Sequence, residues 1–396
     1  MKLDDHLILL VAPVLHAVLM GERAADHELE AFFRRHRGLG SGERRLVSEG
    51  FYAALRHRRR LAAHAGEEGA AALLAALPWL ESPAPPDMPP EIRHSLPDWL
   101  WSAWREERGE AGAEALAEAF NQPAPMDLRV DPRRCSRETL LAELVAAGAE
   151  ARPTPYAPHG VRCFRRLPLG ELPSFQKGGV EVQDEGSQLV SHLLAPPPEG
   201  VVVDLCAGAG GKSLHLAALL GRKGKVIASD ADAARLSRLK PRLERAGYRN
   251  VELLPLRHEG DARLRPWTGK ADAVLVDAPC SGSGTLRRHP ELKGRLTPEG
   301  AAMEAMRQGA LLAAGSRLVR LGGRLVYAVC SLLPQEGEAV VREFLAAESG
   351  WRLGDAGRAL TAGGIPGLAE GDGFLRLDPA RHGTDGFFAA LLLRRA

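Results

Sequence analysis

The sequence predicts an α/β fold: a doubly wound, Rossmann-like domain in the C-terminal half, preceded by a small α+β module and an N-terminal helical domain. Three observations predict it. From Val201 onward, apolar strands alternate with longer amphipathic segments, which is typical of a parallel sheet wound with helices on both faces. Before residue 121, apolar residues recur at helical spacing. The length of 396 residues exceeds what one hydrophobic core usually supports, so we divide the chain into residues 1–120, 121–180 and 181–396.

The first part is expected to be helical because its apolar residues are three and four apart. The predicted helices include residues 24–37, 41–64 and 111–120. An apolar stretch at 7–20 follows Asp4 and Asp5, which argues against a signal sequence, and it is too short to span a bilayer. We expect it to form a buried helix. The proline-rich segment 82–90 cannot continue a helix and marks a loop.

The second part changes to mixed periodicity and is predicted to be a small α+β module. Its elements are a strand MDLRV at 126–130, a helix at 136–148 and a strand VRCFRR at 161–166. Pro173, Gly178 and Gly179 interrupt regular structure near its end.

The third part contains four nearly continuous apolar strands, as expected where both faces of a sheet are covered. They are VVVDL (201–205), KVIASD (225–230), AVLVDAP (273–279) and RLVYAVC (324–330). Ligands of such folds bind at the carboxyl ends of the strands. The chemically suggestive residues all follow those ends, at 204–211, 230, 277–280 and 330.

The composition is that of an ordinary globular protein, with 45% hydrophobic and 26% charged residues and a net charge of +2. Basic clusters at 34–37 and 56–60 are either solvated helix faces or part of an RNA-binding surface. The five cysteines show no C-x-x-C spacing, which excludes a cysteine zinc site and a disulfide framework. We therefore expect a reducing cytoplasm and no metal.

The segment DLCAGAGGKS (204–213) follows a strand and opens a helix, where glycines let backbone amides approach a ligand. A P-loop would need glycine at Cys206, and a dinucleotide fingerprint would need a small residue at Ser213. Two interpretations remain: a cofactor loop for adenosylmethionine, with Asp230 placed to bind ribose hydroxyls, or a glycine-rich turn between packed elements.

Two strand ends carry thiols, because Cys280 follows Asp277 and Pro279 and because Cys330 ends its strand. Cytosine carbon 5 is a poor nucleophile, so an enzyme must first add a thiolate to carbon 6. The reaction also needs a group near the ring nitrogen, a role suited to Asp277, and a base for the carbon 5 proton. The alternative is that each cysteine is a buried small hydrophobe, as we expect for Cys135 and Cys163.

The segment GTLRRHPEL follows the loop that carries Cys280, and it contains Arg287, Arg288 and His289. These residues either hold an RNA phosphate and place a flipped base or lie on the surface without such a role.

From Asn121 to the C-terminus the chain resembles the RsmB/Sun-type RNA 5-methylcytosine methyltransferases. The resemblance is carried by VQDEGSQL (182–189), DLCAGAGGKS, DAPCSGSGTLRRHPE (277–291), the cysteine before SLLPQEGE (331–338) and GTDGFFAALL (383–392). It implies that Cys330 is the nucleophile and that Cys280 helps eliminate the product. Sequence chemistry alone does not rank the two cysteines.

The resemblance further implies S-adenosylmethionine as the cofactor, with Lys212 and Asp277 facing the target base and methyl group. The implied cofactor-lining residues are Cys206, Ala207, Gly208, Ala209, Gly210, Gly211, Lys212, Asp230 and Asp277, with Asp261 aligned across a gap as a third acid. The family commonly has Ala-Ala-Pro-Gly-Gly-Lys in this loop, whereas Gly208, Ala209 and Gly210 loosen it here. Val329 replaces the common threonine before the nucleophile. Neither departure removes a reacting group.

Residues 24–59 resemble a shortened NusB-like domain of the ribosomal members, which implies RNA binding and favours small-subunit (16S) ribosomal RNA as the substrate. Transfer RNA is an alternative substrate for the same chemistry. A non-catalytic RNA-binding factor of ribosome assembly is an alternative of another class. We expect no membrane partner, and we expect a monomer, although the sequence does not determine the oligomeric state.

Overall fold

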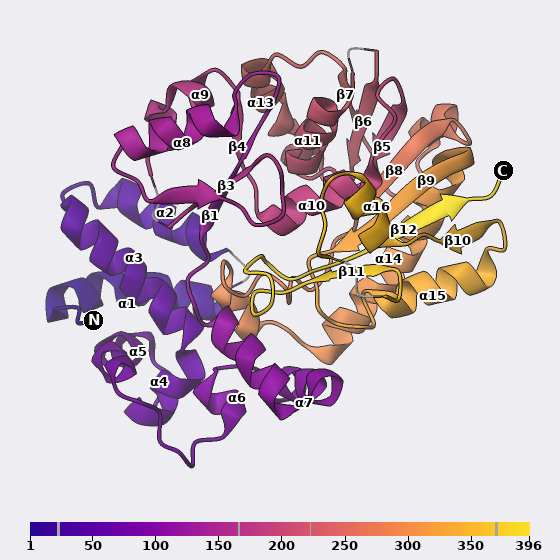
Figure 1. Cartoon of the computed structure of the whole chain (residues 1–396). Coiled ribbons are helices and arrows are strands. Elements are labelled where there is room, and N and C mark those ends of the chain that lie inside the picture. Colours follow the sequence, from indigo (N-terminus) through magenta and orange to yellow (C-terminus); the bar gives the residue numbers. More distant parts are fainter. Residues whose placement is uncertain (22–23, 165–166, 222, 369–370) are drawn as a thin grey trace. The chain divides into compact units, whose positions relative to one another are not determined.

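The computed structural model describes residues 1–21, 24–164, 167–221, 223–368 and 371–396. The chain divides into two compact units, whose elements are labelled in Figure 1. One unit comprises Met1–Ala124, Thr285–Pro298 and Pro379–Arg381, and the other comprises Pro125–Gly284, Glu299–Asp378 and His382–Ala396. Within the described residues, no helix combines the length and the hydropathy needed to cross a bilayer.

The first unit is helical, as predicted. Its elements are α1 (Asp5–Met20), α2 (Ala25–Arg35), α3 (Ser41–Arg56), α4 (Arg58–Ala65), α5 (Ala70–Ala75), η1 (Leu77–Glu81), α6 (Pro90–Arg93), α7 (Asp98–Phe120) and η4 (Pro290–Gly294). The apolar stretch at 7–20 lies in α1, where Val11 and Leu15 are fully buried in a core shared with α2 to α5. The expectation of a buried N-terminal helix is confirmed, and residues 83–89 form the predicted loop.

Residues 285–298 follow the loop that carries Cys280 but fold with the helical unit. Lys293, on η4, is buried and donates hydrogen bonds to the carbonyl oxygens of Arg56 and His94, both at 3.0 Å, and to the side chain of Asn121 at 2.5 Å. Arg287 is also buried, and its carbonyl oxygen accepts a hydrogen bond from Arg56. Of the two interpretations given for Arg287, a position on the surface is therefore wrong, and contact with an RNA phosphate stays a prediction.

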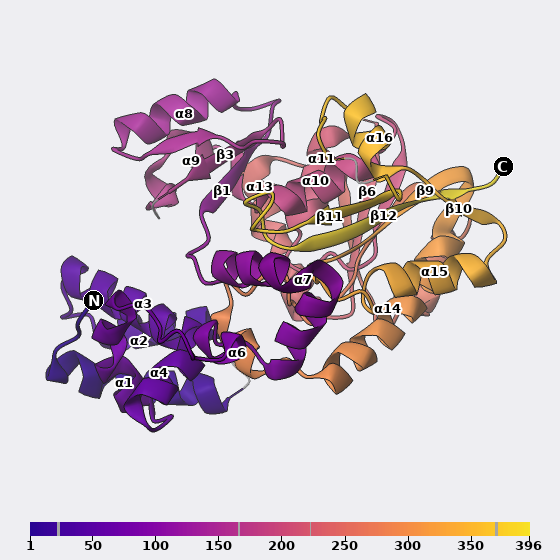
Figure 2. The same cartoon turned by 60° about the horizontal axis from the view of Figure 1, so that its bottom comes forward.

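The second unit begins with the small α+β module, whose sheet has the order β2-β3-β1-β4 with antiparallel pairing. Its elements are β1 (Met126–Val130), α8 (Arg137–Ala146), β2 (Ala151–Pro153), β3 (Gly160–Cys163), η2 (Leu169–Glu171), α9 (Pro173–Gln176) and β4 (Val180–Val182). Helix α8 packs on this sheet through Leu140 and Leu144 (Figure 2). Strand β4 extends the sheet past residue 180. Arg165 and Arg166, which end the predicted strand VRCFRR, lie outside the described residues.

The main sheet has the order β10-β12-β9-β8-β5-β6-β7, with β11 paired to β12. Its strands are β5 (Val201–Asp204), β6 (Lys225–Asp230), β7 (Val251–Pro255), β8 (Ala271–Asp277), β9 (Val319–Val329), β10 (Trp351–Leu353), β11 (Phe374–Leu377) and β12 (Phe387–Arg394). Strands β5 to β9 pair in parallel, as predicted. The prediction of an all-parallel sheet is wrong at one edge, because β12 runs antiparallel to β9, β10 and β11.

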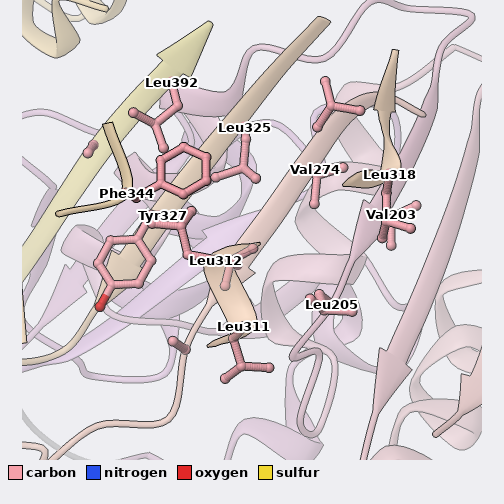
Figure 3. Packing of buried hydrophobic residues seen from close by; sticks show 14 of the residues in the cluster. Val203, Leu205, Val274, Leu311, Leu312, Leu318, Leu325, Tyr327, Phe344 and Leu392 are labelled. Atoms are coloured by element: carbon pink, nitrogen blue, oxygen red, sulfur yellow. The ribbon is translucent and has the colours of Figure 1, made fainter. Parts of the chain in front are cut away.

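Helices cover both faces of this sheet. They are α10 (Glu185–Leu194), α11 (Gly211–Leu219), α12 (Ala233–Ser237), α13 (Leu239–Ala246), α14 (Pro298–Leu318), α15 (Glu338–Ala347) and α16 (Ala356–Ala362), with η3 (Ala262–Trp267) before β8. Alternate residues of β9 enter opposite cores: Leu325 and Tyr327 pack with α14 and α15, whereas Val326 and Ala328 pack with α10, α11 and α16. Figure 3 shows the first of these cores. The doubly wound fold is confirmed.

Candidate active site

The glycine loop lies between β5 and α11, as predicted. Gly208 and Gly210 have φ angles of 55° and 86°, which glycine adopts without a steric penalty. A side chain at Gly210 would also collide with Leu239. Helix α11 starts without a side-chain cap, and Gly211 has open space where a Cβ atom would project. The loop therefore offers backbone amides and room to a ligand at a helix N-terminus.

The Asp230 carboxylate, at the end of β6, faces this loop and accepts hydrogen bonds from the amides of Gly208 at 2.7 Å and Asp232 at 2.8 Å. Each oxygen keeps a further lone pair for a ligand hydroxyl. Asp261 is engaged elsewhere: its carboxylate accepts from the backbone and side chains of Arg257 and Arg263, which lower its pKa. These hydrogen bonds do not bring Asp261 together with the glycine loop, so its role as the third acid stays a prediction.

Lys212 and Asp277 form an ion pair, with Lys212 Nζ and Asp277 Oδ2 2.8 Å apart. Lys212 is in the first turn of α11, and Asp277 ends β8. Burial tends to lower the pKa of Lys212, but the Asp277 carboxylate outweighs it and the pKa is raised. The negative charge of a Cys330 thiolate acts in the same direction, so Lys212 stays an ammonium that can stabilise such a thiolate.

The two predicted thiols meet: Cys280 Sγ and Cys330 Sγ are 3.3 Å apart. The loop after β8 is fixed against the end of β9, because the Gly284 amide donates to the Cys330 carbonyl oxygen at 3.0 Å. The hydrogen bond to Cys330 is the largest cause that raises the pKa of Cys280 well above its usual range, followed by burial. Cys280 is thus a neutral thiol, and either sulfur can be the donor in the contact between them.

The other cysteines take no part in this pair. Cys206 packs against the core of the main sheet, and burial with nearby carboxylates raises its pKa well above the usual range. Its thiol is therefore neutral, and we expect Cys206 to contribute its backbone to the cofactor loop. Cys135 and Cys163 are buried in the small module, as expected.

One carboxylate that our reading of the sequence missed connects the two thiol-bearing segments. Glu336 is fully buried and accepts hydrogen bonds from the amide of Ser281 at 2.8 Å, from the hydroxyls of Ser281 and Ser331, the latter at 2.5 Å, and from Gln308 Nε2 at 3.0 Å. Four donors on one buried carboxylate form a strongly stabilised polar network.

Glu336 reaches both reacting segments because Ser281 follows Cys280 and Ser331 follows Cys330 in the chain. We infer that it positions the two sulfurs relative to each other. The sequence did contain a signal, since Glu336 lies in the SLLPQEGE segment. Glu338 in the same segment is equally acidic, however, so the sequence pattern does not select between them.

Replacing Glu336 by glutamine is expected to lower kcat about 10- to 100-fold and to reduce the free energy of unfolding by about 1–3 kcal/mol, because an amide donor then faces hydroxyl and amide donors. Steady-state methylation and chemical denaturation measure the two effects. Glu338→Gln is the matched control, since Glu338 forms partly exposed ion pairs with Arg342 and Arg376. Equal kcat values for the two variants would contradict the positioning role.

Motifs far apart in the sequence also converge near this site. The Asp385 amide donates to the Asp184 carboxylate, and Gly186 lies so close to the Phe387 ring that a Cβ atom would collide with it. The Phe387 ring in turn lies 5.3 Å from Lys212 Nζ. The segments VQDEGSQL and GTDGFFAALL therefore support the glycine loop from the side of α10.

Comparison with known proteins identifies two regions of the chain. Residues 191–393 match the family model described as 16S rRNA methyltransferase RsmB/F, and residues 96–169 match the RsmF/B-like ferredoxin-like domain.

Curated relatives and a solved structure agree with these matches. The chain is 35% identical to the probable ribosomal RNA small subunit methyltransferase B of Synechocystis sp., over 76% of this chain and 67% of that protein. It is 38% identical to ribosomal RNA small subunit methyltransferase B of Pseudomonas syringae pv. tomato, over 78% and 67%. The crystal structure of PH0851 superposes with a TM-score of 0.80 at 26% identity, over 99% of this chain and 100% of that one.

The alignments thus extend over about two thirds of each curated relative and most of this chain. The chain therefore belongs to the RsmB/F family of 16S rRNA methyltransferases, and it is an S-adenosylmethionine-dependent methyltransferase.

Proposed function

We propose that this protein methylates carbon 5 of a cytosine in small-subunit ribosomal RNA through a covalent bond between Cys330 and the base. The observation that carries the proposal is the pair of thiols, 3.3 Å apart, at the ends of two parallel strands. The Lys212–Asp277 ion pair joins the first turn of α11 to the end of β8, and the glycine loop directly precedes Lys212. Nucleophile, charged partners and cofactor loop thus belong to one edge of the sheet.

Cys330 is the better nucleophile of the two, because the raised pKa of Cys280 keeps that thiol neutral. The raised pKa of Cys280 keeps its proton on sulfur, and that proton can be donated to Cys330. A Cys330 thiolate is stabilised by this hydrogen bond and by the Lys212 ammonium. The family resemblance also implies that Cys330 is the nucleophile. The argument from the Cys280 pKa and the Lys212 charge does not depend on that resemblance.

Addition of the Cys330 sulfur to carbon 6 moves an electron pair of the ring toward carbon 5 and the ring nitrogen. The ring nitrogen takes up a proton from solvent as this charge develops, and Asp277, with one oxygen held by Lys212, is placed to accept a hydrogen bond from the protonated nitrogen. Carbon 5 becomes nucleophilic and takes up the methyl group.

Release requires a base for the carbon 5 proton. Once the Cys330 sulfur is bonded to carbon 6, it carries no negative charge and is a much weaker hydrogen-bond acceptor. Two of the causes that raise the pKa of Cys280 then disappear, so its pKa falls during the reaction. Cys280 can then give its own proton to solvent and, as a thiolate, accept the carbon 5 proton, after which the bond between carbon 6 and the Cys330 sulfur breaks and returns the Cys330 thiolate.

The chain's residues fit S-adenosylmethionine. The uncapped N-terminus of α11 would hold its carboxylate, the open space at Gly211 would admit it, and Asp230 would bind its ribose hydroxyls. When bound, this cofactor supplies an electrophilic methyl group.

Small-subunit ribosomal RNA is proposed as the substrate because the curated relatives bear that name. The small module offers a basic surface for the RNA backbone, since Arg133, Arg134 and Lys177 line one of its pockets. The NusB-like character of the helical unit, the domain boundaries, the monomeric state and the cytoplasmic location stay predictions.

The test is to incubate the full chain with methyl-labelled adenosylmethionine and RNA from a strain that lacks this protein. Mass spectrometry of separately digested ribosomal and transfer RNA then locates 5-methylcytosine. We expect it in the small-subunit ribosomal RNA. Product confined to transfer RNA would favour that substrate, and no product in any RNA would favour the non-catalytic assembly factor.

A further inference from the structure

Three histidines from separate elements form a cluster in the second unit. His159 lies in the turn between β2 and β3, His192 lies on α10 and His215 lies on α11. One ring nitrogen from each falls within 4.8 Å of the other two. The centroids of the His192 and His215 rings are 4.8 Å apart, and those of His159 and His192 are 5.6 Å apart.

Four of the six ring nitrogens of this cluster are buried and have no hydrogen-bond partner among the described residues. They are Nδ1 of His159, Nε2 of His192 and both ring nitrogens of His215. His215 is 1% exposed, so solvent does not replace the missing partners. Buried polar atoms in native proteins are almost always satisfied, which indicates that the cluster holds a further group.

The three rings are in the protonation state that binds metal ions. Burial is the largest cause that lowers the pKa of each, to about 3 for His192. Each imidazole is therefore neutral near pH 7 and presents a lone pair. Lone pairs that converge repel each other unless an electropositive group lies between them.

We propose that His159, His192 and His215 form a binding site for a borderline transition-metal ion, with Zn²⁺ as the ion of choice. Three imidazole ligands with an open fourth position are an established zinc-binding set. Zn–N bonds are about 2.0–2.1 Å long, so two ligand nitrogens of one tetrahedral ion lie about 3.4 Å apart. Ion binding would therefore draw the three rings closer together than their present nitrogen separations of up to 4.8 Å. The proposal departs from our expectation of no metal, which considered the cysteines alone.

The charges around the cluster select among ions. The Arg129 guanidinium lowers the pKa of all three imidazoles, and the Asp131 carboxylate raises that of His159. A neighbouring cation disfavours Mg²⁺ and Ca²⁺, which need oxygen ligands and charge compensation. Ions that bond strongly to imidazole nitrogen, such as Zn²⁺, tolerate the neighbouring Arg129 cation better.

A bound ion would join the small sheet to the two helices behind the glycine loop. His215 lies one helical turn after Lys212, so the ion would fix α11, whose first turn carries the Lys212–Asp277 pair. The site is distinct from the methyl-transfer residues, and the proposal does not depend on the proposed function.

The experiment uses the full chain without an affinity tag, freed of metal by chelator dialysis. Zn²⁺ is titrated against a chromophoric chelator, and Co²⁺ is added in parallel to record its visible absorption. We expect one ion per chain, a Co²⁺ spectrum typical of nitrogen ligation and a higher Tm with Zn²⁺. His159→Leu and His192→Leu, at two partly exposed positions, should each weaken Zn²⁺ binding by about 100-fold or more.

His258→Gln is the matched control, because His258 is exposed and lies outside the cluster. It should bind Zn²⁺ as the wild type does, and circular dichroism confirms that each variant is folded. Equal Zn²⁺ affinities of the wild type and the two cluster variants would overturn the proposal. So would the absence of stoichiometric binding, which would leave a buried water molecule to satisfy the three rings.

Discussion

Replacing Cys330 by alanine is expected to lower the rate of methylation by at least about 10⁴-fold, because it removes the sulfur that bonds to carbon 6 and the raised pKa of Cys280 leaves that thiol a poor replacement. Replacing Cys280 by alanine is expected to leave that bond intact and to block its breakdown. The Cys280→Ala variant should therefore accumulate a protein–RNA adduct that survives denaturing electrophoresis in the presence of RNA and adenosylmethionine. The Cys330→Ala variant should form none.

The control for this pair is Cys135→Ser, which keeps the hydrogen-bonding capacity of a buried cysteine in the small module. It should retain methylation and form no stable adduct. The Cys280→Ala/Cys330→Ala double variant should also form no adduct, which ties the bond to Cys330. An adduct with Cys330→Ala and none with Cys280→Ala would exchange the two roles.

Replacing Asp277 by asparagine is expected to lower kcat about 10²- to 10⁴-fold, since the amide keeps the size of the side chain but loses its charge. Lys212→Met removes the other half of the ion pair. The loss in the double variant should be much smaller than the sum of the two single losses on a free-energy scale, because the pair acts as a unit.

Single-turnover assays of the two variants and the double variant measure this coupling, and calorimetry of adenosylmethionine binding separates catalysis from affinity. The same substitutions in the Cys280→Ala background should slow adduct formation, because Lys212 stabilises the attacking thiolate. Additive losses, or adduct formation at an unchanged rate, would show that the pair serves only to bind cofactor.

Much of the candidate site follows from local patterns in the sequence. Apolar runs fix the strands, and parallel strands bring their carboxyl ends to one edge. This rule predicted that Asp277, Cys280 and Cys330 would lie together, and the 3.3 Å between the two sulfurs confirms it. The glycines of the cofactor loop are likewise a local requirement. Gly208 and Gly210 have positive φ angles, which glycine adopts at a lower cost than other residues.

The errors and omissions involve contacts between residues far apart in the chain. Residues 285–298 directly follow the active-site loop in the chain, but they fold with the helical unit, where Lys293 donates hydrogen bonds to acceptors from 172 to 237 positions away. Strand β12 runs antiparallel because the chain returns through a hairpin from β11, without a crossover helix. No periodic pattern encodes either arrangement.

The order of residues in the chain is enough to predict that thiols, a carboxylate and a glycine loop gather at the strand ends, because their placement follows from short-range backbone geometry. The folded chain adds that the Cys280 thiol is buried against Cys330, that Glu336 joins the two thiol-bearing segments, and that three histidines converge behind α11. The reason is physical: protonation and positioning depend on burial and on charges brought close by folding, and these have no local signature.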